Sequence, residues 1–512
     1  MLDYDRALEL FSLNAFKRNG PPGDYLKLAQ RAVRYARGLP LALIVLGSHL
    51  YGRGRDEWET TLDNCQQVDR VKPILDACYD LKSVIGMKQL QEKALIRIDK
   101  DKTQVDGTES DKIWMHDLIE EMGKEIVRQQ GEPGERSRLW NYDDVDHVLT
   151  NKTGTKKIKG IQVEEHEEEM ICLNAKCFSE MKNLRYLFSY FAHYSGNIDY
   201  LSNELRWLNW SGCSIQSFPS NIHPRKRVAL NISDNHFIIR LWEGLKNFPL
   251  LRSMHLEGCT SLRELPNFTG IPNLEELNLY GCASLVEVHW FVGSLDKLVT
   301  LNLECCSKLV KLPTEISLKS LRAMDLRYCT RLEEFPKIIG KMDSLRELNL
   351  SCTGVKELHL SIENLTELRE LHLDDCKNLT TLPFNIYGLQ NLEILNVSGC
   401  SKLVTFPEIM GKMDSLTELY LGGSGIKELH QSIGNLIGLN ELNLVERKNL
   451  TIIPCSIYEL QNLEILDVSG CSKLVTFPKI KGKMDSLTEL YPVADRGRGE
   501  RGLMRPLKFW GE

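Results

Sequence analysis

The second half of the sequence repeats one short phrase, first seen clearly as Leu274-Glu-Glu-Leu277-Asn-Leu279-Tyr-Gly-Cys282. It returns as Leu298-Val-Thr-Leu301-Asn-Leu303-Glu-Cys-Cys306 and as Leu321-Arg-Ala-Met324-Asp-Leu326-Arg-Tyr-Cys329. Later copies start 23 or 24 residues apart, at Leu345, Leu368, Leu392, Leu416, Leu439, Leu463 and Leu487. A fixed period of this length indicates stacked structural repeats.

The phrase fits L-x-x-L-x-L-x-x-N/C-x-L, the pattern of a leucine-rich repeat. Leu277 and Leu279 flank Asn278, and this alternation predicts a short strand with one buried face. One repeat cannot cover its own leucines, so neighbouring repeats must stack around a shared core. We therefore predict an α/β fold, a leucine-rich-repeat solenoid (horseshoe) over 181–491. Its first, degenerate repeats begin at Leu184, Leu205 and near Arg227.

Cysteine positions follow the same period. Of the 15 cysteines, eight take the N/C place of a repeat: Cys213, Cys259, Cys282, Cys306, Cys329, Cys376, Cys400 and Cys471. There the side chain turns inward and behaves as a small buried hydrophobe, which favours reduced thiols. The sequence has no C-x-x-C pair, so we predict no metal site.

The overall composition is that of an ordinary globular protein. The 512 residues are 42% hydrophobic and 26% charged, and the net charge of −6 gives no support to nucleic-acid binding. The charged start offers no signal peptide, and the apolar run Leu39 to Leu50 is too short for a membrane span. We expect a cytoplasmic protein, with the nucleus as a second location.

The strand positions between the leucines are predicted to face the concave side of the solenoid. Acidic side chains recur there on most repeats, and the plain interpretation is a solvated acidic face. The alternative is a surface for a protein ligand with a basic patch, with large aromatic side chains as anchors. The candidate partner-binding residues are Trp210, Glu276, Tyr280, Glu304, Asp325, Glu347, Glu370 and Tyr420. Joint charge reversal of Glu276, Glu304 and Glu347 is predicted to weaken binding.

Residues 1–62 are predicted to be helical, with a break at Asn19-Gly20-Pro21-Pro22-Gly23. In 63–150, the runs Leu95 to Ile98 and Lys112 to Met115 predict two strands, followed by a helix from Asp117. A strand–strand–helix order fits part of a winged-helix domain. The charged stretch 151–180 is predicted to be a linker, and 492–512 an unstructured tail.

Two motifs precede the repeats. Gly38-Leu39-Pro40-Leu41-Ala42-Leu43 resembles the GLPLAL motif of plant nucleotide-binding, leucine-rich-repeat immune receptors. Ile113-Trp114-Met115-His116-Asp117-Leu118 resembles their MHD motif, in the form of the branch with a Toll/interleukin-receptor-like (TIR) domain. The resemblance identifies 1–62 as a helical part of the family's nucleotide-binding (NB-ARC) region. It also implies that Pro40 and His116 correspond to ADP contacts. The residues alone favour another interpretation of His116, as a polar residue whose hydrogen bonds are satisfied at a strand–helix junction.

The sequence departs from the family in one respect that bears on chemistry. It contains no G-x-x-x-x-G-K-[ST] phosphate loop, and Gly47-Ser-His-Leu-Tyr-Gly52-Arg53 mimics only the spacing. We therefore expect no enzyme activity and no bound cofactor, although full-length relatives bind ADP. The chain is expected to be the rear half of a receptor, either a truncated paralogue or an incomplete gene model.

These observations predict a plant immune receptor fragment whose repeats recognise a pathogen effector or a guarded host protein in defence signalling. The alternatives are an extracellular leucine-rich-repeat receptor or inhibitor, and a non-signalling scaffold. No capping repeat is evident at the end of the solenoid, so self-association is a further expectation.

Overall fold

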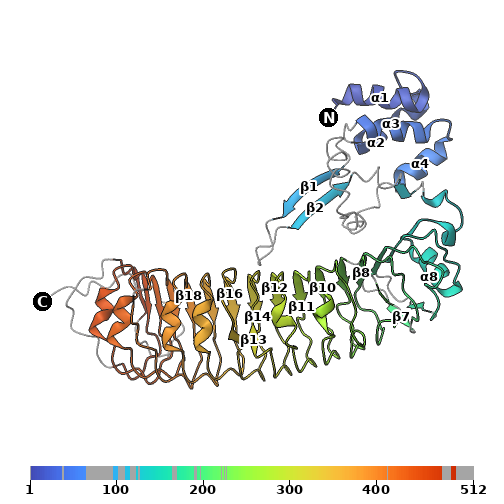
Figure 1. Cartoon of the computed structure of the whole chain (residues 1–512). Helices are drawn as coiled ribbons and strands as arrows, with labels where there is room; N and C mark the ends of the chain where they lie inside the picture. The colour runs from blue at the N-terminus through green and yellow to red at the C-terminus, as the bar shows by residue number, and fades with distance from the viewer. Residues whose placement is uncertain are drawn as a thin grey trace. The chain divides into compact units, whose positions relative to one another are not determined.

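The computed structural model describes residues 2–36, 40–64, 96–101, 110–115, 123–124, 127–163, 170–173, 175–189, 193–195, 198–220, 222–223, 225–226, 228–411, 413–474 and 486–491. The chain forms two compact units, Met1–Leu139 and Trp140–Glu512 (Figure 1).

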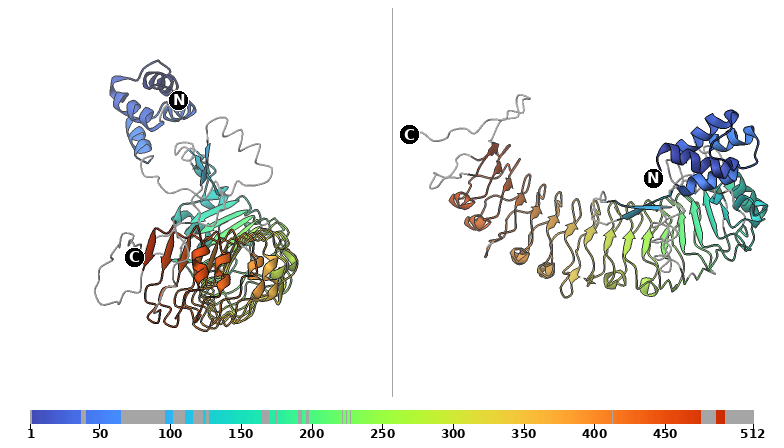
Figure 2. Two further views of the ribbon diagram at one scale, coloured as in Figure 1. Left: turned by 90° about the vertical axis from the view of Figure 1, so that its left-hand side faces the viewer. Right: turned by 90° about the horizontal axis from the view of Figure 1, so that it is seen from above.

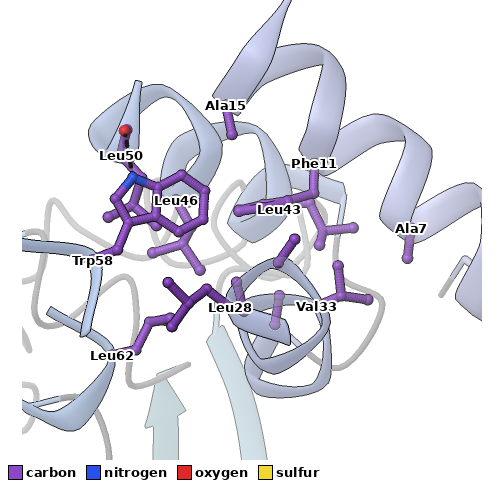
Figure 3. Packing of buried hydrophobic residues seen from close by; sticks show 13 residues of the cluster. Ala7, Phe11, Ala15, Leu28, Val33, Leu43, Leu46, Leu50, Trp58 and Leu62 are labelled. Atoms are coloured by element: carbon purple, nitrogen blue, oxygen red, sulfur yellow. Dashed lines mark hydrogen bonds between the residues drawn. The ribbon is translucent and has the colours of Figure 1, made fainter. Parts of the chain in front are cut away.

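The first unit begins with a helical cluster. Its elements are α1 (Tyr4–Phe16), η1 (Gly23–Tyr25), α2 (Leu26–Ala36), α3 (Pro40–Leu50) and α4 (Arg55–Asn64). The Asp3 side chain caps α1 by accepting a hydrogen bond from the Arg6 amide at 2.9 Å. Figure 3 shows the apolar faces of the helices meeting around Phe11, Leu43 and Trp58, whose indole donates to the Leu50 carbonyl at 3.0 Å. The cluster thus encloses a core of its own.

Gly47 permits the closest helix contact in this cluster. A Cβ atom at Gly47 would lie 2.8 Å from the Phe11 carbonyl oxygen and 2.8 Å from Asn14 Cβ. Only a residue without a side chain lets α3 approach α1 so closely. The glycine that mimicked a phosphate loop by its spacing is therefore a packing residue inside a helix.

A two-stranded antiparallel sheet follows, formed by β1 (Ile96–Asp101) and β2 (Ser110–Met115). Both strands expected in this region are present, and each is longer than the apolar run that indicated it. The predicted helix from Asp117 and the motif residue His116 lie outside the described residues. The unit also contains η2 (Pro133–Glu135) and β3 (Arg138–Leu139).

The second unit is a ladder of parallel strands that confirms the predicted leucine-rich-repeat solenoid. Each strand pairs in register with the next, and spatial order equals sequence order. The strands are β4 (Gly160–Val163), β6 (Tyr186–Ser189), β8 (Trp207–Trp210), β9 (Ala229–Asn231), β10 (Ser253–His255), β11 (Glu276–Asn278), β12 (Thr300–Asn302), β14 (Ala323–Asp325), β16 (Glu347–Asn349), β17 (Glu370–His372), β18 (Ile394–Asn396), β19 (Glu418–Tyr420), β20 (Glu441–Asn443), β21 (Ile465–Asp467) and β22 (Glu489–Tyr491).

Leucines and inward thiols fill the solenoid. From β9 to β21 the middle residue of every strand is buried, as the alternation predicted. The thiols form a second stack, in which each from Cys259 to Cys471 donates to a carbonyl of the preceding repeat, whereas Cys213 accepts from the Asn235 side chain. Cys282 donates to Leu256 at 3.1 Å and Cys400 to Leu373 at 3.0 Å. Burial raises the pKa of these thiols, so they are structural and unreactive.

Short helical turns and minor strand pairs lie on the return side of several repeats. The turns are η3 (Phe268–Gly270), η4 (Val292–Ser294), η5 (Leu360–Asn364), η6 (Phe384–Gly388), η7 (Gln431–Asn435) and η8 (Cys455–Glu459). Minor parallel pairs are β13 (Glu315–Ile316) with β15 (Lys337–Ile338) and β5 (Met170–Cys172) with β7 (His193–Ser195). Figure 2 shows the main sheet along the inner side of the curve of this unit and the η turns along its outer side.

The interpretation of 151–180 as a linker was wrong. Within it, β4 is buried at all four positions and pairs with β6, so it is part of the ladder. Helix α8 (Tyr142–Asn151), which lies within the predicted winged-helix range, packs on β4 and β5. The prediction of a linker was based on the many charged residues of this stretch. The short apolar alternation at Ile161 and Val163 determines the local structure instead.

The described residues lack a membrane-spanning helix and a metal-binding cluster. No helix among them is long and apolar enough to cross a bilayer. The same part of the chain contains no group of three or more histidine, cysteine or acidic side chains placed to hold a metal ion.

Candidate protein-binding surface

The inner side of the ladder presents three columns of side chains, which together we term the concave face. Column 1 holds the residue before the buried middle residue of each strand, column 2 the residue after it, and column 3 the residue two places further on. For β11 these are Glu276, Asn278 and Tyr280. In-register pairing stacks each column along the solenoid at about 4.8 Å per strand.

Most column 2 side chains stabilise the turn that follows each strand. Its asparagine and aspartate side chains accept the backbone amide two residues on, as Asn302 does from Glu304 at 2.9 Å and Asp325 from Arg327 at 3.0 Å. This local hydrogen bond ends the strand, which explains why the sequence places Asn or Asp there. Asp325 therefore has a structural role in addition to its place on the face.

His255 offsets one of the two negative charges of Glu257 and Glu276. Its ring nitrogens lie 3.6 Å from a carboxylate oxygen of each, and Ser253 donates to Glu276 at 3.0 Å. Burial alone would lower the pKa of His255, but the two carboxylates raise it to about 9. Its hydrogen bonds in turn lower the pKa of both glutamates. This group carries a net charge of about −1 at neutral pH.

Arg327 likewise offsets one of the two negative charges of Glu304 and Asp325. Its guanidinium lies 2.8 Å from Glu304 and 2.7 Å from Asp325, with several hydrogen bonds to the aspartate. The two acids raise the pKa of Arg327 further above its ordinary value. Two of the acids predicted to bind a partner are thus occupied within the chain.

Within the part of the chain that the structure describes, no arginine or lysine forms an ion pair with two further pairs of column 1 glutamates. Glu347 and Glu370 are neighbours on β16 and β17, and Glu418 and Glu441 are neighbours on β19 and β20. His372 lies 3.2 Å from Glu370, and the Tyr420 hydroxyl donates to Glu418 at 2.8 Å. Burial and the neighbouring glutamate raise the pKa of Glu347 and of Glu441. Each pair is therefore a place where an added cation would be stabilised.

The aromatic candidates divide into two kinds. Tyr280 is 44% exposed in column 3, and Tyr420 lies half-buried in column 2. Trp210 is only 1% exposed and packs edge-on against Phe178 with ring centroids 6.1 Å apart. Its selection as a partner anchor was wrong, because the last position of β8 points into the core.

The residues that the family resemblance linked to ADP do not form a nucleotide site in the described structure. Pro40 is exposed at the first position of α3. The backbone N–H of that position has no partner within a helix, so a proline there costs no hydrogen bond. His116 lies outside the described residues. No phosphate loop occurs in the 512 residues, and the correspondence of Pro40 and His116 to ADP contacts stays a prediction.

The sequence reasoning did not select four residues that shape this surface. His255 and Arg327 set the charge of its first half, and Glu418 and Glu441 form the second unneutralised pair. His255, Glu418 and Glu441 occupy outward strand positions and Arg327 lies two residues after β14, so the register alone identifies all four as surface residues. The side-chain contacts that give each its electrostatic role are visible only in three dimensions.

Comparison with protein families gives three matches. Residues 60–131 match the winged-helix domain of Roq1-like disease resistance proteins, and 388–489 match the leucine-rich repeats of RPS4B-like disease resistance proteins. Residues 317–422 match a general leucine-rich repeat region.

Curated relatives align with nearly the whole chain. TMV resistance protein N of Nicotiana glutinosa is 31% identical over 511 residues, which are 94% of this chain and 38% of that protein. Disease resistance protein RPS6 of Arabidopsis thaliana is 32% identical over 573 residues, covering 95% of this chain and 49% of the relative. The chain thus spans less than half the length of these relatives.

Comparison with solved structures gives partial matches. A leucine-rich-repeat protein of Leptospira interrogans is 22% identical with a TM-score of 0.39, covering 66% of this chain and 84% of the other. The plant peptide hormone receptor RGFR1, solved in complex with RGF2, is 15% identical with a TM-score of 0.37, covering 69% and 68%.

Proposed function

Because this chain is a relative of the TIR-type plant disease resistance proteins, we propose that its solenoid is the protein-recognition region of an intracellular immune receptor. The ligand is a pathogen effector or a host protein guarded by the receptor, and it binds the concave face. The role is recognition without catalysis, in defence signalling. The proposed location is the cytoplasm, with the nucleus second.

One observation carries this proposal: the concave face holds pairs of carboxylates with which no arginine or lysine forms an ion pair among the described residues. Glu347, Glu370, Glu418 and Glu441 lie on a continuous ladder, with like charges on adjacent strands. Like charges directly opposite each other destabilise a sheet. A basic protein surface would remove that repulsion and gain complementarity along several strands.

The free thiols support the proposed compartment. The inward stack of thiols from Cys213 to Cys471 contains no disulfide. Thiols persist in the reducing cytosol, whereas secreted repeat proteins commonly carry disulfides.

The test compares two variants of equal net charge. One reverses the concave acids (Glu347→Lys, Glu370→Lys, Glu418→Lys, Glu441→Lys). The control reverses four exposed acids in the return segments (Glu334→Lys, Glu357→Lys, Glu408→Lys, Glu428→Lys). Immobilised chains capture proteins from infected plant tissue, and each captured protein is then purified and titrated by calorimetry. We expect binding to the wild type and the control and at least tenfold weaker binding to the concave variant. Equal binding to both variants would refute the role of this face.

A further inference from the structure

The column 1 side chains recur with a period of three strands. Glu347, Glu370 and Ile394 occupy β16, β17 and β18, and Glu418, Glu441 and Ile465 occupy β19, β20 and β21. Each residue of the second set lies 71 residues after its counterpart. Glu489 on β22 continues the series, and the Tyr491 hydroxyl donates to it as Tyr420 does to Glu418, at 2.6 and 2.8 Å.

An internal duplication of 71 residues explains why column 1 repeats every three strands. It does not explain which outward-facing residues are identical in the two copies. Over the first two strands of each set, every described residue of columns 2 and 3 differs between the copies. Asn349, Ser351, His372 and Asp374 correspond to Tyr420, Gly422, Asn443 and Val445. On these strands the column 1 glutamates are the outward residues identical in both copies, and on the third strand Ile394 matches Ile465 and Ser398 matches Ser469. The feature that the two surfaces share in column 1 is therefore a glutamate pair followed by an isoleucine.

The third strand of each set separates the pairs with an apolar rung. Ile394 and Ile465 are half-buried on the concave face, next to Glu370 and Glu441 respectively. The aliphatic stem of an arginine or lysine can lie along such a side chain while its head reaches the carboxylates. Each set thus offers both parts of a subsite for a long cationic side chain.

We propose that the concave face contains two equivalent subsites, Glu347–Glu370–Ile394 and Glu418–Glu441–Ile465, that bind one partner segment bearing two arginine- or lysine-rich clusters. The proposal rests on the proposed function of this face. Three strand spacings place the subsites about 14 Å apart. The partner must present its two cationic clusters at that separation, so spacing as well as charge selects it.

Synthetic rods of fixed length test the spacing. Proline-rich peptides extend by about 3.1 Å per residue, so Arg-Arg-(Pro)3-Arg-Arg separates its arginine pairs by roughly 15 Å. Arg-Arg-(Pro)9-Arg-Arg carries the same charge and separates them by roughly 34 Å. Labelled with fluorescein, both are titrated with the full chain at low ionic strength by fluorescence anisotropy.

We expect the short rod to bind at least tenfold more tightly than the long rod, because it engages both subsites at once. Glu347→Gln with Glu370→Gln, or Glu418→Gln with Glu441→Gln, should each reduce the affinity for the short rod to that for the long rod. The matched control is Glu334→Gln with Glu357→Gln, which should change neither affinity. Equal affinities for the two rods, or no loss in either double variant, would overturn the two-subsite proposal. Capture of a protein that is lost only in the concave charge-reversal variant would still support the proposed function.

Discussion

Arg447 is a charged residue in the core of the solenoid, and replacing it with cysteine is predicted to stabilise the protein. It occupies the inward N/C place of its repeat and is 0% exposed. Its counterpart 71 residues earlier is Cys376, whose thiol donates to the Leu350 carbonyl at 3.0 Å. Arg447→Cys therefore restores the side chain that the fold accommodates elsewhere.

The magnitude follows from the hydrogen bonds that Arg447 lacks. One terminal nitrogen donates to the Ile426 carbonyl, whereas Nε and the other terminal nitrogen have no partner within the described structure. Desolvation lowers the pKa of Arg447 from 12.5 to about 10, which corresponds to a cost of about 3 kcal/mol. Replacement by the smaller cysteine leaves some empty volume at a cost of about 1 kcal/mol. We therefore expect a net gain of about 2 kcal/mol.

Because a solenoid unfolds by repeats, hydrogen exchange of the full chain is the suitable assay. Amides around β20 and β21, such as that of Leu444, which donates to Asp467 at 2.7 Å, should exchange about 30-fold more slowly in Arg447→Cys. The reciprocal Cys376→Arg should accelerate exchange around β17 and leave β10 unchanged. Unaltered exchange in Arg447→Cys, or tolerance of Cys376→Arg, would refute the reasoning.

Three further predictions concern other parts of the chain. The pKa of His255 is about 9 in the folded state and 6.5 in the reference state, so its stabilisation is complete below pH 6.5 and is lost as pH rises through 9. His255→Gln should cost about 1 kcal/mol at pH 6, allowing for partial exposure, and nothing at pH 10, measured by urea unfolding. Gly47→Ala should destabilise the helical cluster by about 2 kcal/mol through the clash with α1, seen as faster exchange in α1 and α3 only. Tyr328 has a φ of 61°, so Tyr328→Gly should slow local exchange by a few-fold, a gain of about 1 kcal/mol. Faster exchange there would contradict this.

The sequence predicted the solenoid because its geometry depends on one strong period. Leu277 and its equivalents must face inward for any repeat to be covered, so spacing determines strand, register and face together. The same register could have placed Trp210 correctly. It lies two residues after Leu208, at an inward position, and its size alone made it resemble a partner anchor. Position in the repeat is a better guide to exposure than residue type.

The electrostatics of the concave face could not be predicted from the register. Glu276, Glu304 and Glu347 are equivalent by sequence as outward-facing acids, so the register predicts the same effect on partner binding for charge reversal at each. In the structure, His255 pairs with Glu276 and Arg327 with Glu304, across strands more than 20 residues apart in sequence. Only Glu347 remains without a cation between it and its acidic neighbour. These differences depend on side-chain contacts between repeats, which the period does not specify.

The two copies of the duplicated segment show that surface and core respond differently to change. At Val445 and Arg447 the second copy replaces Asp374 and Cys376, so one outward charge is lost and one buried charge is gained. The buried arginine lowers the local free energy of unfolding of the neighbouring strands. The Glu418–Glu441 repulsion also has a cost, yet a bound cation can remove it. A ligand that bridges β19 and β20 would therefore stabilise the same repeats that Arg447 weakens, so binding and local stability are coupled in this part of the solenoid.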